Sequence, residues 1–236
     1  MRFRFHPCLS WAHRASPVSA SFISAILVCL ALMPLAATCA RAADFTPVFK
    51  PTLDAQPAAG DIQIDGRLDD AGWASAASTT QFVERAPGEN IAPLVETEAM
   101  LTYDDDNVYV AFVCVDDPAR LRATMCQRDQ YTTDDAVGVL IDTFGDAVWA
   151  YEFFVNPYGI QRDLMWTSVH GEDAGFDMIW HAAARITETG YVVEMAVPLA
   201  GMRFPDSDAQ SWRVNFARNH PRESYHRYSW AAYDRN

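Results

Sequence analysis

Two tryptophans and a group of polar side chains are the best candidates for binding chemistry in this sequence. Trp166 and Trp180 stand in a stretch, 156–180, that is rich in Asp, Asn, Gln and Arg. An indole ring can stack on the apolar C–H face of a sugar ring while polar neighbours bind the sugar hydroxyls. We therefore predict Trp166 and Trp180 as stacking residues. The predicted polar partners are Arg128, Asp135, Glu152, Asn156 and Gln161.

Each of these predictions has a structural alternative. A tryptophan is often a core residue, which is the expectation for Trp73 and Trp212 and stays open for the two stacking candidates. Arg128 and Asp135 could instead form ion pairs at the rim of the domain, where such pairs contribute little to stability.

Catalytic patterns are weak. The sequence has no Gly-x-Ser-x-Gly, no Gly-rich phosphate loop and no dinucleotide fingerprint. Glu152 and Glu194 could be proposed as the two carboxyls of a glycoside hydrolase. Both are expected in the middle of strands, whereas catalytic residues favour loops, so hydrolysis of O-glycosyl compounds is only a third hypothesis.

No metal site is predicted from histidine or cysteine. The histidines beyond residue 42 lack the spacing of metal ligands. The run Asp104–Asp106 could hold calcium, which prefers oxygen ligands, but consecutive acids between two strands are more often a solvated turn. Calcium is therefore a minor expectation and no other cofactor is predicted.

The first 42 residues have the pattern of an export signal. Arginines come first, an apolar run follows at 22–37, and Ala40-Arg41-Ala42 is a small-x-small cleavage site. We predict cleavage between Ala42 and Ala43 and an exported protein, in the periplasm, at the outer membrane or outside the cell. Residues 43–60 are then a polar lead segment and 61–236 the domain.

Export changes what the cysteines can do. Only Cys114 and Cys126 lie beyond the leader. A disulfide between them can form in an oxidising compartment. Two free thiols are an equal alternative, since free Cys is often buried.

Composition and charge narrow the class of protein. The chain has 236 residues, 50% of them hydrophobic and 21% charged, which is typical of a globular protein. Residues 43–236 hold 14 basic residues against all 31 acids, a net charge of −17. Because nucleic-acid binding depends on Lys and Arg, nucleic acid is excluded as a partner.

The elements that would position the candidate residues are short strands. Alternating apolar residues recur between turn residues, and almost no helix pattern separates them. About ten strands of this kind predict an all-β fold, an antiparallel sandwich of immunoglobulin-like or jelly-roll-like type. The alternation places Tyr151, Phe153 and Val155 on the core face, and Glu152 and Phe154 on the other. The expected segments are 61–66, 95–103, 107–116, 136–144, 147–156, 160–166, 181–187, 191–197, 212–218 and 225–233.

A series of motifs in this order resembles carbohydrate-binding module family 9. They are Ile64–Trp73, Tyr103–Val110, Arg128-Asp129, Ile141–Thr143, Glu152–Gly159, Trp180, Glu194–Pro198, Arg203–Pro205, Trp212, Asn215–Arg218 and Trp230. The resemblance is greatest to the branch found at the N-terminus of exported bacterial proteins with a C-terminal region like an outer-membrane barrel.

That resemblance implies a β-sandwich that binds sugars or polysaccharides of xylan or cellulose type. Such modules support carbohydrate catabolism beside glycoside hydrolases, and some hold calcium. The leading hypothesis is therefore an exported, non-catalytic carbohydrate-binding module. The alternative is a structural or docking domain of an outer-membrane assembly, whose barrel region would be a partner absent from this chain.

Overall fold

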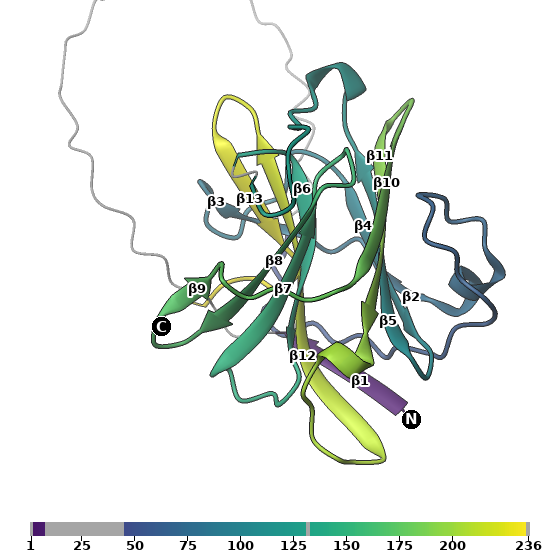
Figure 1. The fold of residues 1–236 in the computed structure, drawn as a ribbon. Helices are drawn as coiled ribbons and strands as arrows, with labels where there is room; N and C mark the ends of the chain where they lie inside the picture. The colour runs from purple at the N-terminus through teal and green to yellow at the C-terminus, as the bar shows by residue number, and fades with distance from the viewer. Residues whose placement is uncertain (1, 8–44, 131–132, 235–236) are drawn as a thin grey trace, which may run out of the picture.

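The chain forms two antiparallel β-sheets that face each other. The computed structural model describes residues 2–7, 45–130 and 133–234. An eight-stranded sheet has the order β3-β13-β12-β6-β7-β8-β9, with β1 beside β12, and a five-stranded sheet has the order β10-β11-β5-β4-β2 (Figure 1). The predicted all-β sandwich is confirmed. The strands are β1 Arg2–Pro7, β2 Ala77–Thr79, β3 Val83–Ala86, β4 Thr97–Tyr103, β5 Asn107–Val115, β6 Ala136–Asp142, β7 Trp149–Val155, β8 Gln161–Thr167, β9 Gly171–Asp173, β10 His181–Thr187, β11 Gly190–Pro198, β12 Ala209–Pro221 and β13 Tyr225–Ser229.

Helical structure in the described residues is limited to three short 3-10 turns. They are η1 Ala71–Ser75, η2 Pro118–Arg120 and η3 Leu199–Gly201. The turn η1 buries the side chain of Trp73. No helix among the described residues has the length and apolar character needed to cross a membrane.

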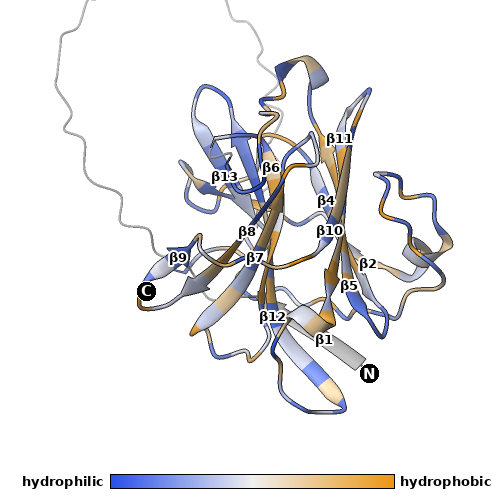
Figure 2. Ribbon diagram, in the orientation of Figure 1, coloured by the Kyte–Doolittle hydropathy of each residue, from blue (hydrophilic) through white to orange (hydrophobic). Residues whose placement is uncertain are grey.

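The core lies between the sheets, and alternation along the strands builds it. Tyr151, Phe153 and Val155 of β7 point inward as predicted, against Val139 of β6 and Phe216 of β12. Apolar residues concentrate on the strands that face one another, while the β12–β13 hairpin is hydrophilic (Figure 2). Trp73 and Trp212 are both buried, at 3% and 0% exposure, as predicted.

Most predicted strands are present, with shifts of a few residues at their ends. The exception is 61–66, which is irregular and bends at Gly66, a residue with φ of +85°. Its backbone N–H groups bind a side chain instead of a neighbouring strand, as described below. The short strands β2, β3 and β9 were not predicted, because three or four residues are too few for alternation to show.

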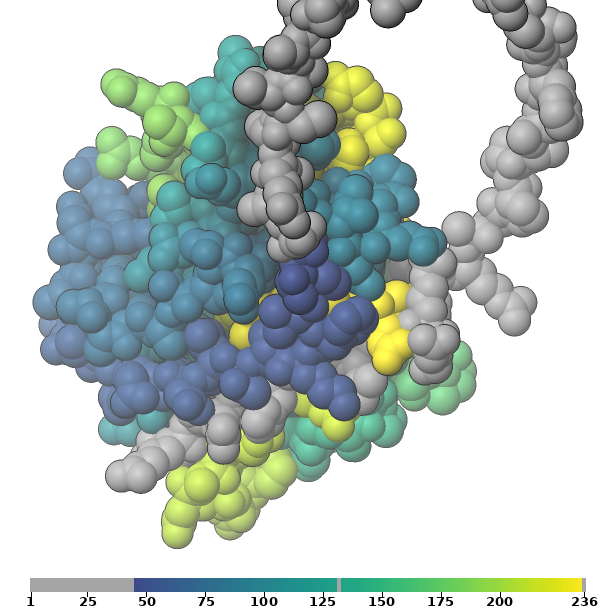
Figure 3. Space-filling model, turned by 180° about the vertical axis from the view of Figure 1, so that it is seen from behind, coloured from purple at the N-terminus to yellow at the C-terminus, as the bar shows by residue number. Residues whose placement is uncertain are grey.

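The segment predicted as a polar lead packs against the domain. Leu53 and Ala55 are core residues, and the N–H of Ala58 donates to the carbonyl of Tyr103. The back view shows the lead segment, from residue 45 on, spread over this side of the domain beside C-terminal residues (Figure 3). The backbone contact of Val48 with Ala232 joins these two parts of the chain.

The predicted leader falls mostly outside the described residues. Ala42 and Ala43, the predicted cleavage residues, lie there too. Residues 2–7 form β1, which pairs in parallel with 209–214 of β12. Cleavage at residue 43 stays a prediction.

Candidate functional site

A groove opens on the outer face of the eight-stranded sheet. Side chains from β3 at one end of the strand order and from β9 at the other line the same hollow, so this face is concave. Its cavity volume is about 210 Å³, which has room for several water molecules and is on the scale of one monosaccharide. Its lining is polar and charged over a floor of Leu140 and Leu164.

Glu152 lies on the floor of this groove. It stands on the outer face of β7, between its register partners Leu140 of β6 and Leu164 of β8. Its exposure is 2%, and its Oε1 atom has no hydrogen-bond partner in the described part of the chain. Burial, and then the nearby carboxylate of Glu172, raise the pKa of Glu152 well above the usual value against the opposing effect of Arg162 and Arg85. The protonated form that this favours can donate one hydrogen bond to a ligand.

An aromatic ring and two amides border Glu152. Phe154, two residues along β7, is half-buried and lies across Gly138 of β6. A Cβ atom at position 138 would collide with the ring, so the glycine makes room for it. Asn215 and Asn219 of β12 present amide groups on the same side. Phe154 was not among the predicted site residues, although alternation already placed it on the face of Glu152.

Trp166 belongs to the same sheet face. It is half-buried on β8, opposite Ala150 of β7 and Glu172 of β9. It is two residues from Leu164, a lining residue, so it stands next to the groove without lining it. Its proposed stacking role is compatible with this position.

Trp180 occupies a different place from the one predicted. Its ring is only 3% exposed and packs edge-on against Phe153, at a centroid distance of 5.1 Å. Its indole N–H points to Asp163 at 3.4 Å. The prediction of an open stacking ring at Trp180 is wrong, because the inner face of β7 buries it in the core.

Arg128, Asn156 and Gln161 hold loops in place. The Arg128 guanidinium pairs with Asp163 and donates to the carbonyl of Met178 at 2.5 Å. Gln161 donates its amide to the carbonyl of Trp180 at 3.0 Å. Asn156 is fully buried; its amide donates to Asp134 and its oxygen accepts the N–H groups of the 158–160 turn. These three residues do not line the groove.

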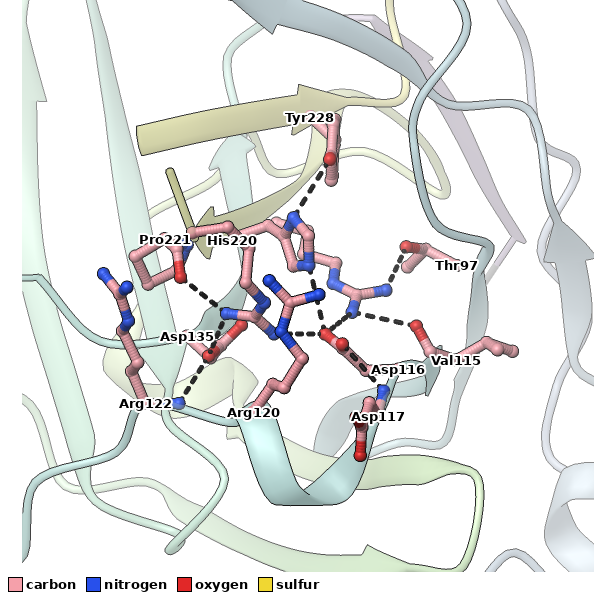
Figure 4. Close-up of polar contacts among 12 residues, drawn as sticks. Thr97, Val115, Asp116, Asp117, Arg120, Arg122, Asp135, His220, Pro221 and Tyr228 are labelled. Atoms are coloured by element: carbon pink, nitrogen blue, oxygen red, sulfur yellow. Dashed lines mark hydrogen bonds and ion pairs between the residues drawn. The ribbon is translucent and has the colours of Figure 1, made fainter. Parts of the chain in front are cut away.

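Asp135 belongs to a buried network of charges between the two sheets (Figure 4). Arg222 links Asp135, at 2.9 Å, to Asp116, at 2.6 Å. Asp116 also pairs with Arg218 at 2.9 Å and lies 3.2 Å from a ring nitrogen of His220. Asp135 therefore forms an ion pair, as the structural alternative expected. Its partner is Arg222, however, and Asp135 is fully buried instead of lying at the rim.

This network does not fit a metal ion. Ligand atoms of Asp116, Asp135 and His220 lie within 4.8 Å of one another, the usual starting point for a cation site. Two guanidinium groups, of Arg218 and Arg222, already neutralise these carboxylates, so a cation would meet like charges. Neither arginine was among the predicted site residues, although Arg218 belongs to the Asn215–Arg218 motif and falls on the inward side of the alternation in β12.

The proposed hydrolase pair does not meet. Glu194 points outward from β11 of the five-stranded sheet, and Glu152 points outward from β7 of the other, so the core separates them. Glu194 accepts hydrogen bonds from the N–H groups of 65–67 and from the Trp73 indole at 2.8 Å. Its role is to bind the irregular 61–67 segment.

The calcium candidate is a hydrogen-bonded turn. Asp104 accepts the N–H groups of Asp106 and Asn107 on one oxygen and the hydroxyl of Tyr109 on the other. Protein donors thus occupy both oxygens of Asp104, while Asp105 and Asp106 are exposed in the turn.

The cysteines are both free. Cys114 is buried in β5, where burial raises the pKa of its thiol, and Cys126 is half-buried. Of the two alternatives left open by the sequence, the structure has the free thiols.

The fold and the groove define a β-sandwich domain with one concave, polar sheet face. The sequence pattern of the family described as carbohydrate family 9 binding domain-like matches residues 64–234. The chain belongs to this family. The comparison with curated proteins finds no match.

Two solved structures are similar to this chain. One is a carbohydrate binding module family 9 domain from Caldicellulosiruptor kristjanssonii in complex with glucose, with 17% identity, a TM-score of 0.52, and coverage of 74% of this chain and 83% of that chain. The other is a module of the same family and organism in complex with cellotriose, with the same identity and TM-score, and coverage of 73% and 80%. At this identity the likeness shows the fold alone.

Proposed function

We propose that this domain is a non-catalytic carbohydrate-binding module that holds a sugar in the groove over Glu152. The observation that carries the proposal is the unpartnered Oε1 atom of a side chain that is 2% exposed. A buried polar atom without a partner destabilises a protein, and a ligand hydroxyl is a suitable partner. Family membership and the sugar complexes of similar structures support the same class of ligand.

The neighbouring side chains suit a sugar ring. Phe154 offers an apolar ring face, and Asn215 and Asn219 offer amide donors and acceptors for hydroxyl groups. As further parts of the proposal, the domain is exported, binds glycans of cellulose or xylan type, and serves carbohydrate catabolism beside a hydrolase or an outer-membrane barrel.

Calorimetric titration of the whole chain with glucose and with cellotriose tests the proposal. We expect saturable binding that falls about tenfold or more in Glu152→Ala, the loss of one well-placed hydrogen bond to a buried group. Glu188→Ala is the matched control, since Glu188 is exposed in the turn between β10 and β11.

Two results would contradict the proposal. The first is a folded protein that retains neither sugar, nor any glycan on an array. The second is release of reducing sugar from a bound glycan that stops in Glu152→Gln, which would make the domain a hydrolase.

A further inference from the structure

Two arginines line one end of the groove without a hydrogen bond or an ion pair to any residue that the structure describes. Arg85 of β3 and Arg227 of β13 lie on paired strands, where Arg227 is the register partner of Ala86. Both are half-buried, and neither has a hydrogen bond or an ion pair within the described residues. Their charges act on each other: burial and then Arg227 lower the pKa of Arg85.

This arrangement is unfavourable in the protein alone. Two like charges in a partly buried site repel each other, and a guanidinium carries five N–H donors that need acceptors. The buried Arg218, by contrast, donates hydrogen bonds to Glu96, Thr97, Val115 and Asp116. The absence of such partners at Arg85 and Arg227 is therefore a local feature of the groove.

The acids of the groove do not fill this role. Asp134 accepts hydrogen bonds on both oxygens, from Thr124 and Asn156. The charges of Glu152 and of Glu172, which lies on β9 across the groove, act on Arg85 and oppose the lowering of its pKa, but neither carboxylate has a hydrogen bond or an ion pair with Arg85 in the described part of the chain. Glu152 lies on β7, between the β3 and β9 ends of the sheet, and its Oε1 atom has no hydrogen-bond partner among the described residues.

We propose that the groove selects an acidic sugar, whose carboxylate binds Arg85 and Arg227 while a ring hydroxyl binds Glu152. The planar fork of each guanidinium matches the two oxygens of a carboxylate. A uronic acid brings this carboxylate and the hydroxyls on one ring, in a cavity of monosaccharide scale. The inference rests on the proposed function and adds the class of sugar.

Titration of the whole chain with glucuronate, its methyl ester, glucose and acetate tests the proposal. We expect glucuronate to bind at least tenfold more tightly than the ester or glucose, and acetate not to bind measurably. Arg85→Gln and Arg227→Gln should each weaken glucuronate binding about tenfold, the effect of one charge-assisted contact, and so reduce the preference for glucuronate over glucose. Arg185→Gln, on exposed β10 of the other sheet, is the control with the same charge change.

Folding of the variants is checked by thermal unfolding. Because neither substitution removes a hydrogen bond of the described residues, the melting temperatures should stay close to that of the wild type. Equal affinity for glucuronate and glucose, unchanged by Arg85→Gln, would overturn the acidic-sugar inference and leave the proposed function standing. Tight binding of acetate would also overturn it. If no sugar binds, both proposals fail.

Discussion

Arg218 and Asp116 form an ion pair of 2.9 Å in which neither side chain is more than 5% exposed. Arg218 comes from β12 of the larger sheet and also donates to the carbonyls of Glu96 and Val115, at one end of the smaller sheet. The pair therefore joins the two sheets. Since β12 also contributes Asn215 and Asn219 to the groove, this junction supports the binding face.

Asp116→Asn should lower the free energy of unfolding by about 3–5 kcal/mol at pH 7, because it leaves the buried charge of Arg218 without its carboxylate and leaves Arg222 with Asp135 alone. Burial alone would raise the pKa of Asp116, but the nearby His220 ring, the hydrogen bond from Arg222 and the charge of Arg218 lower it well below the usual value. The stabilisation is thus present above the ordinary Asp pKa of about 4 and is lost as the pH falls further. Urea unfolding at pH 7 and pH 3 measures both effects.

The exposed Asp105 provides the control for this prediction. Asp105→Asn should leave stability within about 0.5 kcal/mol of the wild type. If the free energy of unfolding of the wild type exceeds that of Asp116→Asn by as much at pH 3 as at pH 7, the prediction is wrong.

Trp180→Ala should cost about 3–5 kcal/mol of stability, because it empties a core site against Phe153. Trp166→Ala removes a half-buried ring and should cost about 1 kcal/mol. Its larger effect should fall on sugar affinity. Denaturant midpoints and sugar titrations of both variants check the prediction, and equal losses of stability would show that Trp166 is a core residue as well.

Glu152→Gln should change how stability depends on pH. An acid whose pKa is raised on folding makes the folded state less stable as the pH rises from the ordinary Glu value of about 4.3 to the raised value. The groups that face Glu152 are Glu172, which raises its pKa, and Arg162 and Arg85, which lower it. The variant should therefore gain stability relative to the wild type between pH 5 and pH 8, as followed by thermal unfolding. The exposed Glu188→Gln is the control, and its difference in stability from the wild type should stay constant across this range. The same constant difference for Glu152→Gln would show that Glu152 does not titrate abnormally.

Export should produce a chain that begins at Ala43. Ala40 and Ala42 occupy the small-residue positions before the cleavage site. Cleavage also removes β1, so that 209–214 of β12 loses this neighbour. Mass spectrometry of the exported protein measures the N-terminus, and a mass that retains Cys39 with an attached lipid would show an acyl anchor instead.

The sequence predicts the sandwich well and its binding face only in part. Alternation assigns Glu152 and Phe154 to one side of β7, because the period of a strand is two residues. It cannot show that Trp180, in an irregular stretch after β9, turns back into the core against Phe153. Side chains in loops have no periodic constraint on their direction.

Contacts between distant segments are the other part that the sequence does not show. Asp116 and Arg222 are 106 residues apart, and no local pattern pairs them. Arg85 and Arg227 meet in the groove only because β13 lies next to β3 in the sheet, a topology that depends on the whole fold.

A map of backbone amide shifts on titration with a sugar shows directly whether the groove over Glu152 is the binding site. With glucose or cellotriose added to isotope-labelled protein, we expect the shifted amides to cluster on β7, β12 and β13, around Glu152, Asn219 and Arg227. Amides of the five-stranded sheet around Glu194 should not move. Shifts centred on that sheet, or none at saturating sugar, would contradict a binding site in the groove.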